Sequence, residues 1–260
     1  MIGENNISVI CCWNNSQQYQ TFVDSLKKQT VRVKVIGIDN RKQQFTSCSC
    51  ALNFALDKVD TKYVIFAHQD ILLQQENVIE KYISYLEMIN ENSILGVAGS
   101  TFDSPYMKTN ILVKDKNQLE YGGSYRVKEI EKCDTLDECF FGGYTKYFKE
   151  NLFDEKVCNA WHLYAVELCL RAKCNGGTVY VCDIPMIHYS KGKTDASYNR
   201  GFYNLCKAYC KKIDFIRTPC CYACRTNFIS RLLYYFRKEL GRCLRSRSKE
   251  YDYCRKYYCV

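Results

Sequence analysis

The first hundred residues alternate between short apolar runs and longer segments that carry apolar side chains at helical spacing. The apolar runs are residues 7–13, 33–38, 63–67 and 95–99. The first helical segment begins near residue 17, and the next two cover residues 47–58 and 76–90. Runs of this length fit strands buried on both faces of a parallel sheet, and parallel strands need a crossover connection such as a helix. The alternation therefore predicts an α/β fold with a doubly wound sheet.

The remaining chain has shorter elements. Residues 104–134 contain short β-like pieces between polar and glycine turns, which predicts a hairpin insertion. The elements expected after it are helices over 146–151 and 163–174, a strand over 178–182 and basic helical structure after residue 192. Because the chain has no repeat and no Pro/Gly/Ser-rich linker, we expect a body over residues 1–192 with a basic, Tyr-rich helical extension over 193–260 packed on or near it.

Composition is that of an ordinary globular protein, with 47% hydrophobic and 25% charged residues. No apolar run approaches the roughly 18 residues of a membrane-spanning helix, and the opening residues lack the regions of a signal peptide. We therefore expect a cytoplasmic protein whose 18 cysteines are reduced and packed like small hydrophobic residues. A zinc site at Cys221-x-x-Cys224 is the less favoured alternative, because no second Cys-x-x-Cys accompanies it.

Charge is concentrated at one end of the chain. Residues 193–260 hold 16 Lys and Arg against 5 Asp and Glu, a net charge of +11, whereas residues 1–192 hold 21 against 23, a net charge of −2. The same segment holds ten of the 22 tyrosines. This pattern indicates an anionic partner such as a phospholipid headgroup, a lipid-linked phosphate or a nucleic acid, or else a solvated basic surface.

One stretch of this segment has the pattern of an amphipathic helix. Its apolar residues are Ile229, Leu232, Leu233, Phe236 and Leu240, and its basic residues are Arg231, Arg237, Lys238, Arg242, Arg245 and Arg247. Two alternatives follow. Either the helix lies on an anionic membrane surface, or its apolar stripe packs against the body of the protein.

Polar residues follow the predicted strands where an α/β sheet binds ligands. Asp39, His68 and Asp70 all stand at strand ends, and the carboxyl ends of strands form the ligand crevice of such sheets. Neither a P-loop nor a Gly-x-Gly-x-x-Gly fingerprint follows the first strand, so a phosphorylated ligand needs a metal. Asp70 suits Mg²⁺ or Mn²⁺, which prefer oxygen ligands, although a carboxylate there is equally able to cap the next turn.

Four segments carry a resemblance to a known family. They are residues 7–13 with Asn14-Asn15, residues 35–40 ending in Asp39-Asn40, the run Tyr-Val-Ile-Phe-Ala-His-Gln-Asp over 63–70, and residues 161–188 ending in His188. On these residues the chain resembles, over residues 6–192, the family 2 glycosyltransferases of the GT-A fold. The branch that it resembles is the bacterial glycosyltransferase-like one, with His-Gln-Asp in place of Asp-x-Asp. The resemblance implies a Rossmann-like mixed sheet flanked by helices.

The resemblance also implies an activity. Such enzymes transfer a sugar from a nucleotide-diphosphate donor, here expected to be a UDP-sugar, to an acceptor hydroxyl with inversion and with the help of a divalent metal. The acceptor is expected to be a glycan, a polysaccharide or a lipid-linked molecule. The residues carried over to donor binding are Cys12, Trp13, Asn14, Asp39, Asn53, His68, Gln69 and Asp70. Asp70 and His188 are the expected ligands of Mn²⁺ or Mg²⁺.

The chain departs from the family pattern at the general base. Tyr164 and Ala165 stand where the common pattern has Glu-Asp. The nearest candidates for catalysis are His162, whose pKa can lie near neutrality, and Glu167, which has the alternative role of holding the helix or His162 in place. Asp137, Glu138 and Trp161 are the candidates for the acceptor side.

This departure leaves a second function open. The usual base is absent and the metal motif is altered. The alternative function is therefore that of a catalytically impaired GT-A protein that binds a nucleotide sugar or a glycan. A third class, a nucleic-acid binder that uses the basic, Tyr-rich segment, is not expected because no nucleic-acid-binding module accompanies it.

Overall fold

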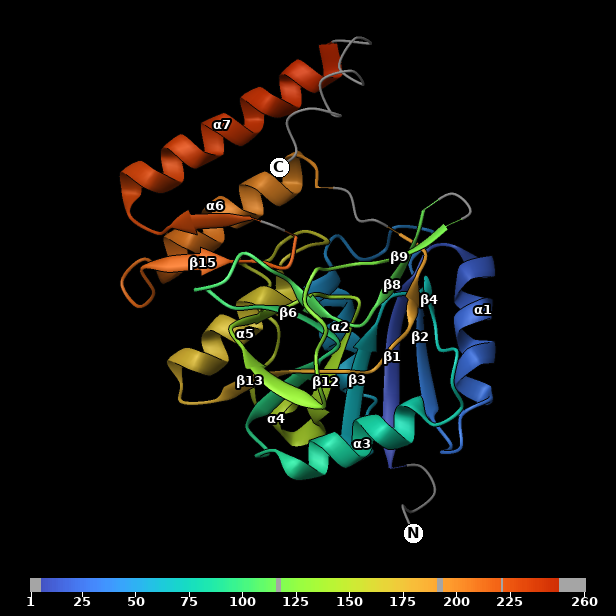
Figure 1. Cartoon of the computed structure of the whole chain (residues 1–260). Coiled ribbons are helices and arrows are strands. Elements are labelled where there is room, and N and C mark those ends of the chain that lie inside the picture. The colour runs from blue at the N-terminus through green and yellow to red at the C-terminus, as the bar shows by residue number, and fades with distance from the viewer. Residues whose placement is uncertain (1–5, 116–117, 191–193, 221, 248–260) are drawn as a thin grey trace.

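A computed structural model of the chain describes residues 6–115, 118–190, 194–220 and 222–247. Its centre is a seven-stranded sheet in the order β10-β13-β5-β12-β3-β1-β2 (Figure 1). The strands of this sheet are β1 (Ile7–Trp13), β2 (Lys34–Asp39), β3 (Tyr63–Ala67), β5 (Ser93–Gly96), β10 (Ile130–Cys133), β12 (Phe140–Tyr144) and β13 (Thr178–Cys182). β1 pairs in parallel with both β2 and β3.

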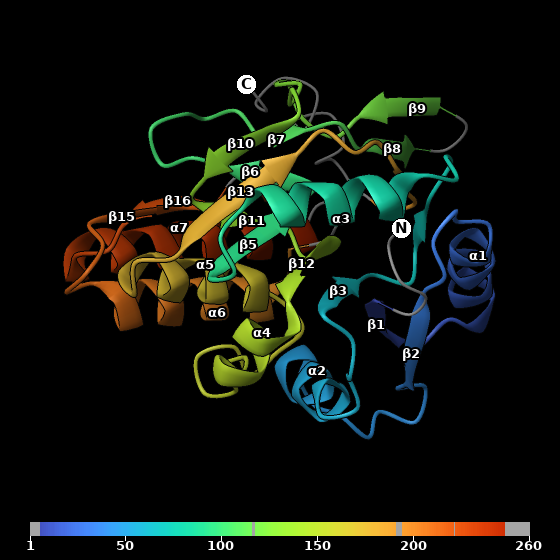
Figure 2. The same ribbon diagram turned by 90° about the horizontal axis from the view of Figure 1, so that it is seen from below.

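Helices cover both faces of the sheet, as Figure 2 shows from below. Alternate residues of β1 point to opposite faces, so that Ile7 and Val9 belong to one apolar cluster and Ile10 to the other. The first cluster is closed by α1 (Ser16–Lys27) and α3 (Val78–Met88). The second is closed by α2 (Cys48–Leu56), α4 (Thr145–Glu150) and α5 (Tyr164–Cys174). The predicted α/β architecture with a mixed sheet flanked by helices is confirmed.

The sheet contains one strand that the sequence analysis did not predict. β12 lies in the middle of the sheet and pairs antiparallel with β3 on one side and β5 on the other. Its sequence, Phe-Phe-Gly-Gly-Tyr, contains two glycines, which are typical of turns. Both glycines are required for space, because a Cβ at Gly142 would stand 2.0 Å from the carbonyl oxygen of Val64. Close backbone approach therefore explains why this strand is rich in glycine.

Two smaller sheets are built from the region predicted as a hairpin insertion. The predicted strand over residues 95–99 divides at Val97, and its second half, β6 (Ala98–Ser100), joins β7 (Lys108–Thr109) and β11 (Thr135–Leu136). The expected hairpin is formed by β8 (Leu112–Asp115) and β9 (Gln118–Tyr121). That hairpin extends a sheet with β4 (Ile71–Leu72) and β14 (Ile187–His188), in the order β4-β14-β8-β9.

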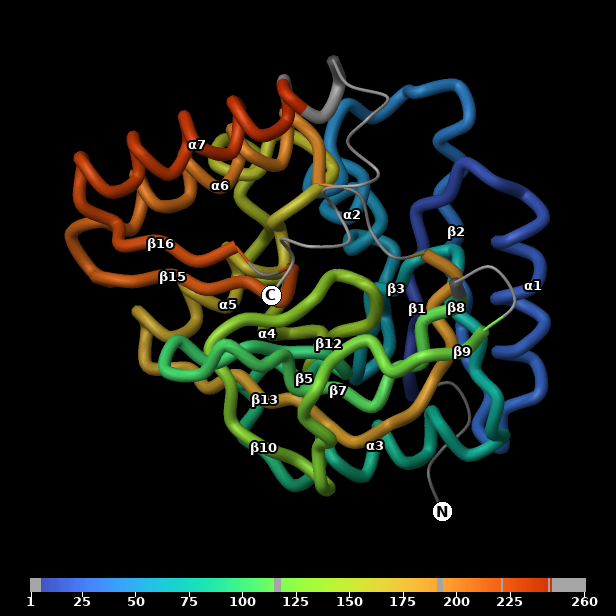
Figure 3. The backbone as a smooth tube through the Cα atoms, turned by 45° about the horizontal axis from the view of Figure 1, so that its top comes forward, coloured from blue at the N-terminus to red at the C-terminus, as the bar shows by residue number. Residues whose placement is uncertain are grey.

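The C-terminal segment forms α6 (Ala196–Tyr209), β15 (Phe215–Arg217), β16 (Ala223–Arg225) and α7 (Phe228–Arg247). Side chains of α6, such as Phe202 and Leu205, are buried in the same apolar cluster as α5. The segment is therefore packed on the body, and α6 and α7 run side by side in both Figure 1 and Figure 3. Across the described residues, no helix combines the length and the apolar character needed to cross a membrane.

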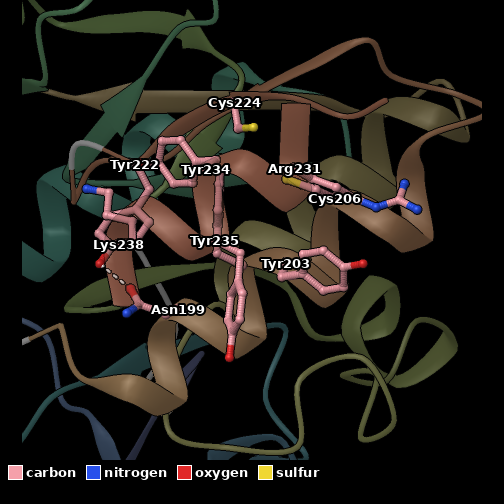
Figure 4. Close-up of a pocket in the computed structure, with 10 residues that line it drawn as sticks. Asn199, Tyr203, Cys206, Tyr222, Cys224, Arg231, Tyr234, Tyr235 and Lys238 are labelled. Atoms are coloured by element: carbon pink, nitrogen blue, oxygen red, sulfur yellow. Dashed lines mark hydrogen bonds between the residues drawn. The ribbon is translucent and has the colours of Figure 1, made fainter. Parts of the chain in front are cut away.

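The sequence left two orientations open for α7, and one of them is wrong. Four of the five residues that were expected to form a packing stripe, Ile229, Leu233, Phe236 and Leu240, are 59–67% exposed. The face of α7 that packs against the body instead contains Arg231, Tyr234, Tyr235 and Lys238, which Figure 4 shows turned toward α6 and β16. The apolar stripe therefore does not pack against the body.

Candidate functional site

The carboxyl ends of β1, β2 and β3 meet at one edge of the sheet because these strands are parallel neighbours. The chain that leaves β3 carries His68, Gln69 and Asp70 past this edge and then forms β4. β14 pairs with β4 so that His188 lies opposite Ile71. The two strands therefore bring His188 next to a motif that is more than a hundred residues away in the sequence.

His68, Asp70 and His188 form a compact cluster. Asp70 Oδ1 lies 3.3 Å from His188 Nε2 and 4.0 Å from His68 Nδ1, and the two imidazole rings are 5.7 Å apart between centroids. Burial by itself would raise the pKa of Asp70, but the neighbouring His188 outweighs it, so that the pKa is lowered. Asp70 is therefore a carboxylate at neutral pH, ready to interact with a cation.

The two histidines differ in protonation. Burial, together with the charge of His188, lowers the pKa of His68, so that its ring is neutral at physiological pH. Burial would also lower the pKa of His188, but contact with Asp70 prevails and raises it. The cluster therefore contains one neutral imidazole, one imidazole paired with a carboxylate, and that carboxylate.

These three residues fit a divalent metal. One ligand atom from each lies within 4.8 Å of the others, and this is the group of metal-binding side chains found among the described residues. In that part of the chain His188 Nε2 is buried, and its contact with Asp70 Oδ1 at 3.3 Å lacks the geometry of a hydrogen bond. A cation placed between His188 and Asp70 would satisfy both groups, and the mixture of imidazole and carboxylate suits Mn²⁺.

Tyr164 contacts the cluster through His68. Its hydroxyl lies 3.3 Å from His68 Nε2 and also forms a hydrogen bond with the buried thiol of Cys48. Tyr164 opens α5, at a position where the family pattern has an acidic residue. In the sequence, Tyr164 stands out only because an acidic residue is absent there. Its contact with His68 was not predicted, because the two residues are 96 positions apart.

A cleft of about 860 Å³ opens beside the cluster. Its walls are Cys12, Trp13, Asn14, Asn15, Asn40, Arg41, Gln43, Phe45, Thr46, Gln69 and Trp161. Trp13 stacks on Tyr19 with ring centroids 4.8 Å apart and an interplanar angle of 6°. Gly37 makes room for this pair, because a Cβ there would overlap the Tyr19 hydroxyl. The indole is therefore held rigidly at the carboxyl end of β1.

Arg41 joins the two strands that border the cleft. Its guanidinium lies 4.8 Å from the Trp13 ring centroid and forms a bidentate ion pair with Asp39, at 2.6 Å for the shortest contact. Hydrogen bonds from Arg41 lower the pKa of Asp39 to about 2. Arg41 was not among the predicted site residues, although it stands only two positions after Asp39, where a longer side chain reaches back across β1.

Gln69 connects the loop that holds His68 and Asp70 with the loop after β1. Its Oε1 accepts the backbone N–H groups of Asn14 at 2.9 Å and Asn15 at 2.8 Å, and its Nε2 donates to the Asn14 side chain at 2.9 Å. Asn15 in turn caps α1. The middle residue of His-Gln-Asp therefore fixes the shape of the cleft with the same amide that was expected to contact the donor.

Two predicted residues have other positions. Asn53 was expected at the donor, but its amide exchanges two hydrogen bonds with the backbone of Phe153 and donates a third to Glu155, so both polar atoms are occupied in holding that loop. Trp161 was expected on the acceptor side. It lines the same cleft as Trp13 and Gln69 and is 39% exposed.

His162 and Glu138 lie together at the start of α5. His162 Nδ1 is 4.0 Å from Glu138 Oε2, and burial lowers the pKa of His162. Glu138 accepts the backbone N–H groups of Leu163 and Tyr164, while burial and the nearby Asp137 hold its pKa well above the usual range. Leu163 has a φ of 71°, an unfavourable conformation for a leucine. Glu138 therefore replaces the side-chain cap that α5 lacks.

The expectation that Glu167 takes part in catalysis is not supported by its position. Its side chain is 2% exposed and forms an ion pair with Arg171 at 3.1 Å. The hydroxyl of Tyr209 donates to the same carboxylate at 2.7 Å. One carboxylate oxygen therefore joins α5 to Tyr209 of α6, and both oxygens pair with Arg171 one turn along α5, which agrees with the alternative role of holding the helix.

No curated protein sequence matches the chain. Its fold is similar to the structure of GalNAc-T7 with UDP, GalNAc and Mn²⁺, with 11% identity, a TM-score of 0.57, and coverage of 82% of this chain and 52% of that one. It is also similar to S. aureus TarS 1–349 in complex with UDP-GlcNAc, with 12% identity, a TM-score of 0.53, and coverage of 79% and 66%. The chain thus spans about half the length of GalNAc-T7.

At identities of 11% and 12%, these two structures show that the chain shares their fold and do not by themselves assign its family. The family is assigned from a match to the amino-acid sequence. The profile described as "Glycosyltransferase like family" matches residues 8–212, a range that includes the cleft, the His-Asp-His cluster and the start of α5 with His162. The chain belongs to this glycosyltransferase-like family and has the GT-A fold.

Proposed function

We propose that the protein is a glycosyltransferase that moves a sugar from a nucleotide-diphosphate donor to an acceptor hydroxyl. The observation that carries this proposal is the His68–Asp70–His188 cluster beside a wide polar cleft at the carboxyl edge of the sheet. UDP and Mn²⁺ are present in the structure of GalNAc-T7, and UDP-GlcNAc in that of TarS, which supports a UDP-sugar as donor and Mn²⁺ or Mg²⁺ as the metal.

Each end of the donor has a matching group in the cleft. The nucleoside lies along Cys12, Trp13 and Asn14, where the rigid Trp13 indole offers a surface for stacking. Asp39 accepts hydrogen bonds from the base or the ribose, since it is ionised at any physiological pH. The diphosphate lies toward His68 and Asp70.

Asp70 and His188, with His68 as a third ligand, would hold the metal, which would supply Lewis acidity to the nucleoside diphosphate leaving group. The protein keeps two of these ligands deprotonated, whereas His188, whose pKa Asp70 raises, would release its proton when a metal binds. Asp70 remains ionised beside His188, and His68 remains neutral because it is largely desolvated.

His162 is the base in this proposal. A base has to be unprotonated before it takes the proton of the acceptor hydroxyl, and the lowered pKa of His162 keeps its ring neutral near pH 7. The negative charges of Asp195 and Asp137, which act on His162, stabilise the imidazolium that forms. Asp137 and Glu138 border the acceptor side, and attack from this side, opposite the leaving diphosphate, gives inversion.

The acceptor that we propose is a glycan, a polysaccharide or a lipid-linked molecule on the cytoplasmic side of the membrane. The net charge of +11 over residues 193–260 supports a phosphate-bearing or membrane-bound acceptor. It is also the basis for proposing that the protein works peripherally at the inner face of the membrane.

Thermal unfolding with a panel of nucleotides and nucleotide sugars, each with and without Mn²⁺, tests this function. A ligand at 100 times its Kd stabilises the native state by about 2.7 kcal/mol, and we expect such a shift for UDP or a UDP-sugar with Mn²⁺. Asp70→Asn should abolish the dependence on Mn²⁺. Asp60→Asn, in an exposed ion pair with Lys34, is the matched control and should behave like wild type.

A GT-A protein that binds a nucleotide sugar or a glycan without transfer is the alternative. Such a protein would show the same Mn²⁺-dependent shift in thermal unfolding. It would release no UDP, either with an acceptor or by hydrolysis in water. UDP release that depends on both Asp70 and His162 would exclude this alternative, whereas the lack of a shift with every nucleotide would contradict both functions.

A further inference from the structure

The outward face of α7 has no role in the site described above. Six of its large apolar side chains are 48–67% exposed, namely Phe228, Ile229, Leu233, Phe236, Leu240 and Leu244. At 100° per residue, all of these except Phe228 fall within a sector of about 80° on the helix. They form a continuous apolar stripe along most of a 20-residue helix, and an exposed apolar patch of this kind is a mark of an interaction site.

The opposite face of α7 shows why the helix is oriented in this way. Lys238 Nζ lies 3.9 Å from the ring centroid of Tyr222 and 5.2 Å from that of Tyr234. Arg231 lies 5.6 Å from the Tyr203 ring centroid and donates to the carbonyl oxygen of Thr226. These contacts surround a cavity of only about 10 Å³ (Figure 4). Cations stacked on tyrosines, rather than the apolar stripe, therefore hold α7 to the body.

A polar contact further fixes the helix. Glu239, the single acidic residue of α7, accepts a hydrogen bond from Asn199 of α6 at 2.6 Å and pairs with Arg242 at 2.8 Å. Asn199 also accepts from the Tyr222 hydroxyl at 2.7 Å. These polar contacts anchor the buried face of α7 within the chain, and the apolar face is presented outward.

Charge indicates what lies against this face. The sequence of α7 has six basic residues and one acidic residue, a net charge of +5. Arg237 is exposed beside the stripe, and Lys207, Lys211 and Arg225 are exposed on the neighbouring elements. An apolar stripe flanked by cations matches the interface of a bilayer that contains anionic lipids, where side chains enter the acyl boundary and cations meet the headgroups.

We propose that α7 inserts its apolar stripe into the surface of an anionic phospholipid bilayer. α7 lies on the side of the molecule toward which the carboxyl ends of β1 and β3 point (Figure 1), so a membrane-bound acceptor is presented on the side of the cleft. This inference extends the peripheral location proposed above and rests, for its biological purpose, on the proposed function. The binding itself does not depend on catalysis.

Flotation of the full chain with vesicles tests the inference. We expect binding to vesicles of phosphatidylcholine with phosphatidylglycerol, and weaker binding to phosphatidylcholine alone. Leu233→Gln with Leu240→Gln should weaken partitioning about 100-fold, because burial of each leucine contributes on the order of tenfold. Met88→Gln with Leu152→Gln, which changes apolar side chains that are 65% and 47% exposed elsewhere, should leave binding unchanged.

Three results would overturn the inference. They are the absence of wild-type binding, binding that survives the double leucine change, and a concentration-dependent dimer that is lost with the same change while vesicles are not bound. The last result would assign the stripe to a second copy of the chain. The Mn²⁺-dependent shift with UDP, measured without vesicles, reports on the donor site separately, so failure of one proposal is distinguishable from failure of the other.

Discussion

At the scale of single residues, the site depends on polar side chains that orient those expected to touch the ligands. Tyr164 and His68 illustrate this most clearly. The Tyr164 hydroxyl lies between the Cys48 thiol and His68 Nε2. When Tyr164 donates to Cys48 it accepts from Nε2–H, and this leaves the lone pair of His68 Nδ1 on the side of Asp70, where a metal binds.

We therefore expect Tyr164→Phe to weaken Mn²⁺ binding by about 10–100-fold, the usual effect of losing a residue that orients a metal ligand. Mn²⁺ binding to the protein without substrate, followed by electron paramagnetic resonance, measures this directly. Tyr85→Phe removes a hydroxyl that is bonded to Asp183, remote from the cluster, and is the control. Equal Mn²⁺ affinity in the two variants would show that Tyr164 has only a packing role.

The pH dependence of transfer should report on His162. Its pKa lies below 6.5 because burial disfavours the charged ring, and a base works only when it is unprotonated. kcat/KM should therefore be constant near pH 7 and should fall as the pH decreases through that lowered value. His162→Gln should lower the rate by about 10²–10⁴-fold and remove this limb.

A second variant tests the sign of the effect. The negative charge of Asp195 raises the pKa of His162, so Asp195→Asn should move the acid limb to lower pH, while asparagine still caps α6. An acid limb that stays in place in both variants would assign the base to another residue.

At the scale of elements, the structure explains which strands and helices could be predicted. β1, β3 and β13 begin and end where the apolar runs do, because strands buried on both faces have no competing pattern. β12 was missed because its glycines are required by the backbone of Val64 across the sheet. The start of α5 was predicted to within one residue, but not its cap, since its N-terminal N–H groups are satisfied by Glu138 from another loop.

The contact between α5 and α6 gives the prediction at this scale. Glu167→Gln removes the charge that pairs with Arg171 in the core, and breaking a buried pair of this kind costs on the order of 2–3 kcal/mol. Urea unfolding measures the loss of stability. Transfer activity per folded molecule should remain that of wild type, because Glu167 faces Tyr209 and not the cleft.

Asp24→Asn, which changes an exposed pair with Lys27, is the control for Glu167→Gln and should leave stability unchanged. The opposite pattern, a loss of turnover at unchanged stability, would return Glu167 to the list of catalytic candidates.

At the scale of the whole molecule, the composition of the C-terminal segment was informative but its orientation was not. Counting charges located the basicity in residues 193–260, and helical spacing located the stripe of α7. The same spacing is compatible with a stripe turned inward. Which side faces the body is decided by Tyr203 and Tyr222, whose rings accept the cations of α7, and these contacts join parts of the chain that no local pattern connects.

The three hydrogen bonds of Gln69 have a consequence for ligand binding. They fasten the loop that carries His68 and Asp70 to the loop after β1 that borders the cleft, so rearrangement of one loop strains the other. Thermodynamic coupling is reciprocal: the factor by which Mn²⁺ tightens nucleotide binding is the factor by which the nucleotide tightens Mn²⁺ binding. If the metal and the nucleotide bind as proposed, this one amide side chain would couple them, and metal bound without nucleotide would be held more weakly than metal bound with it.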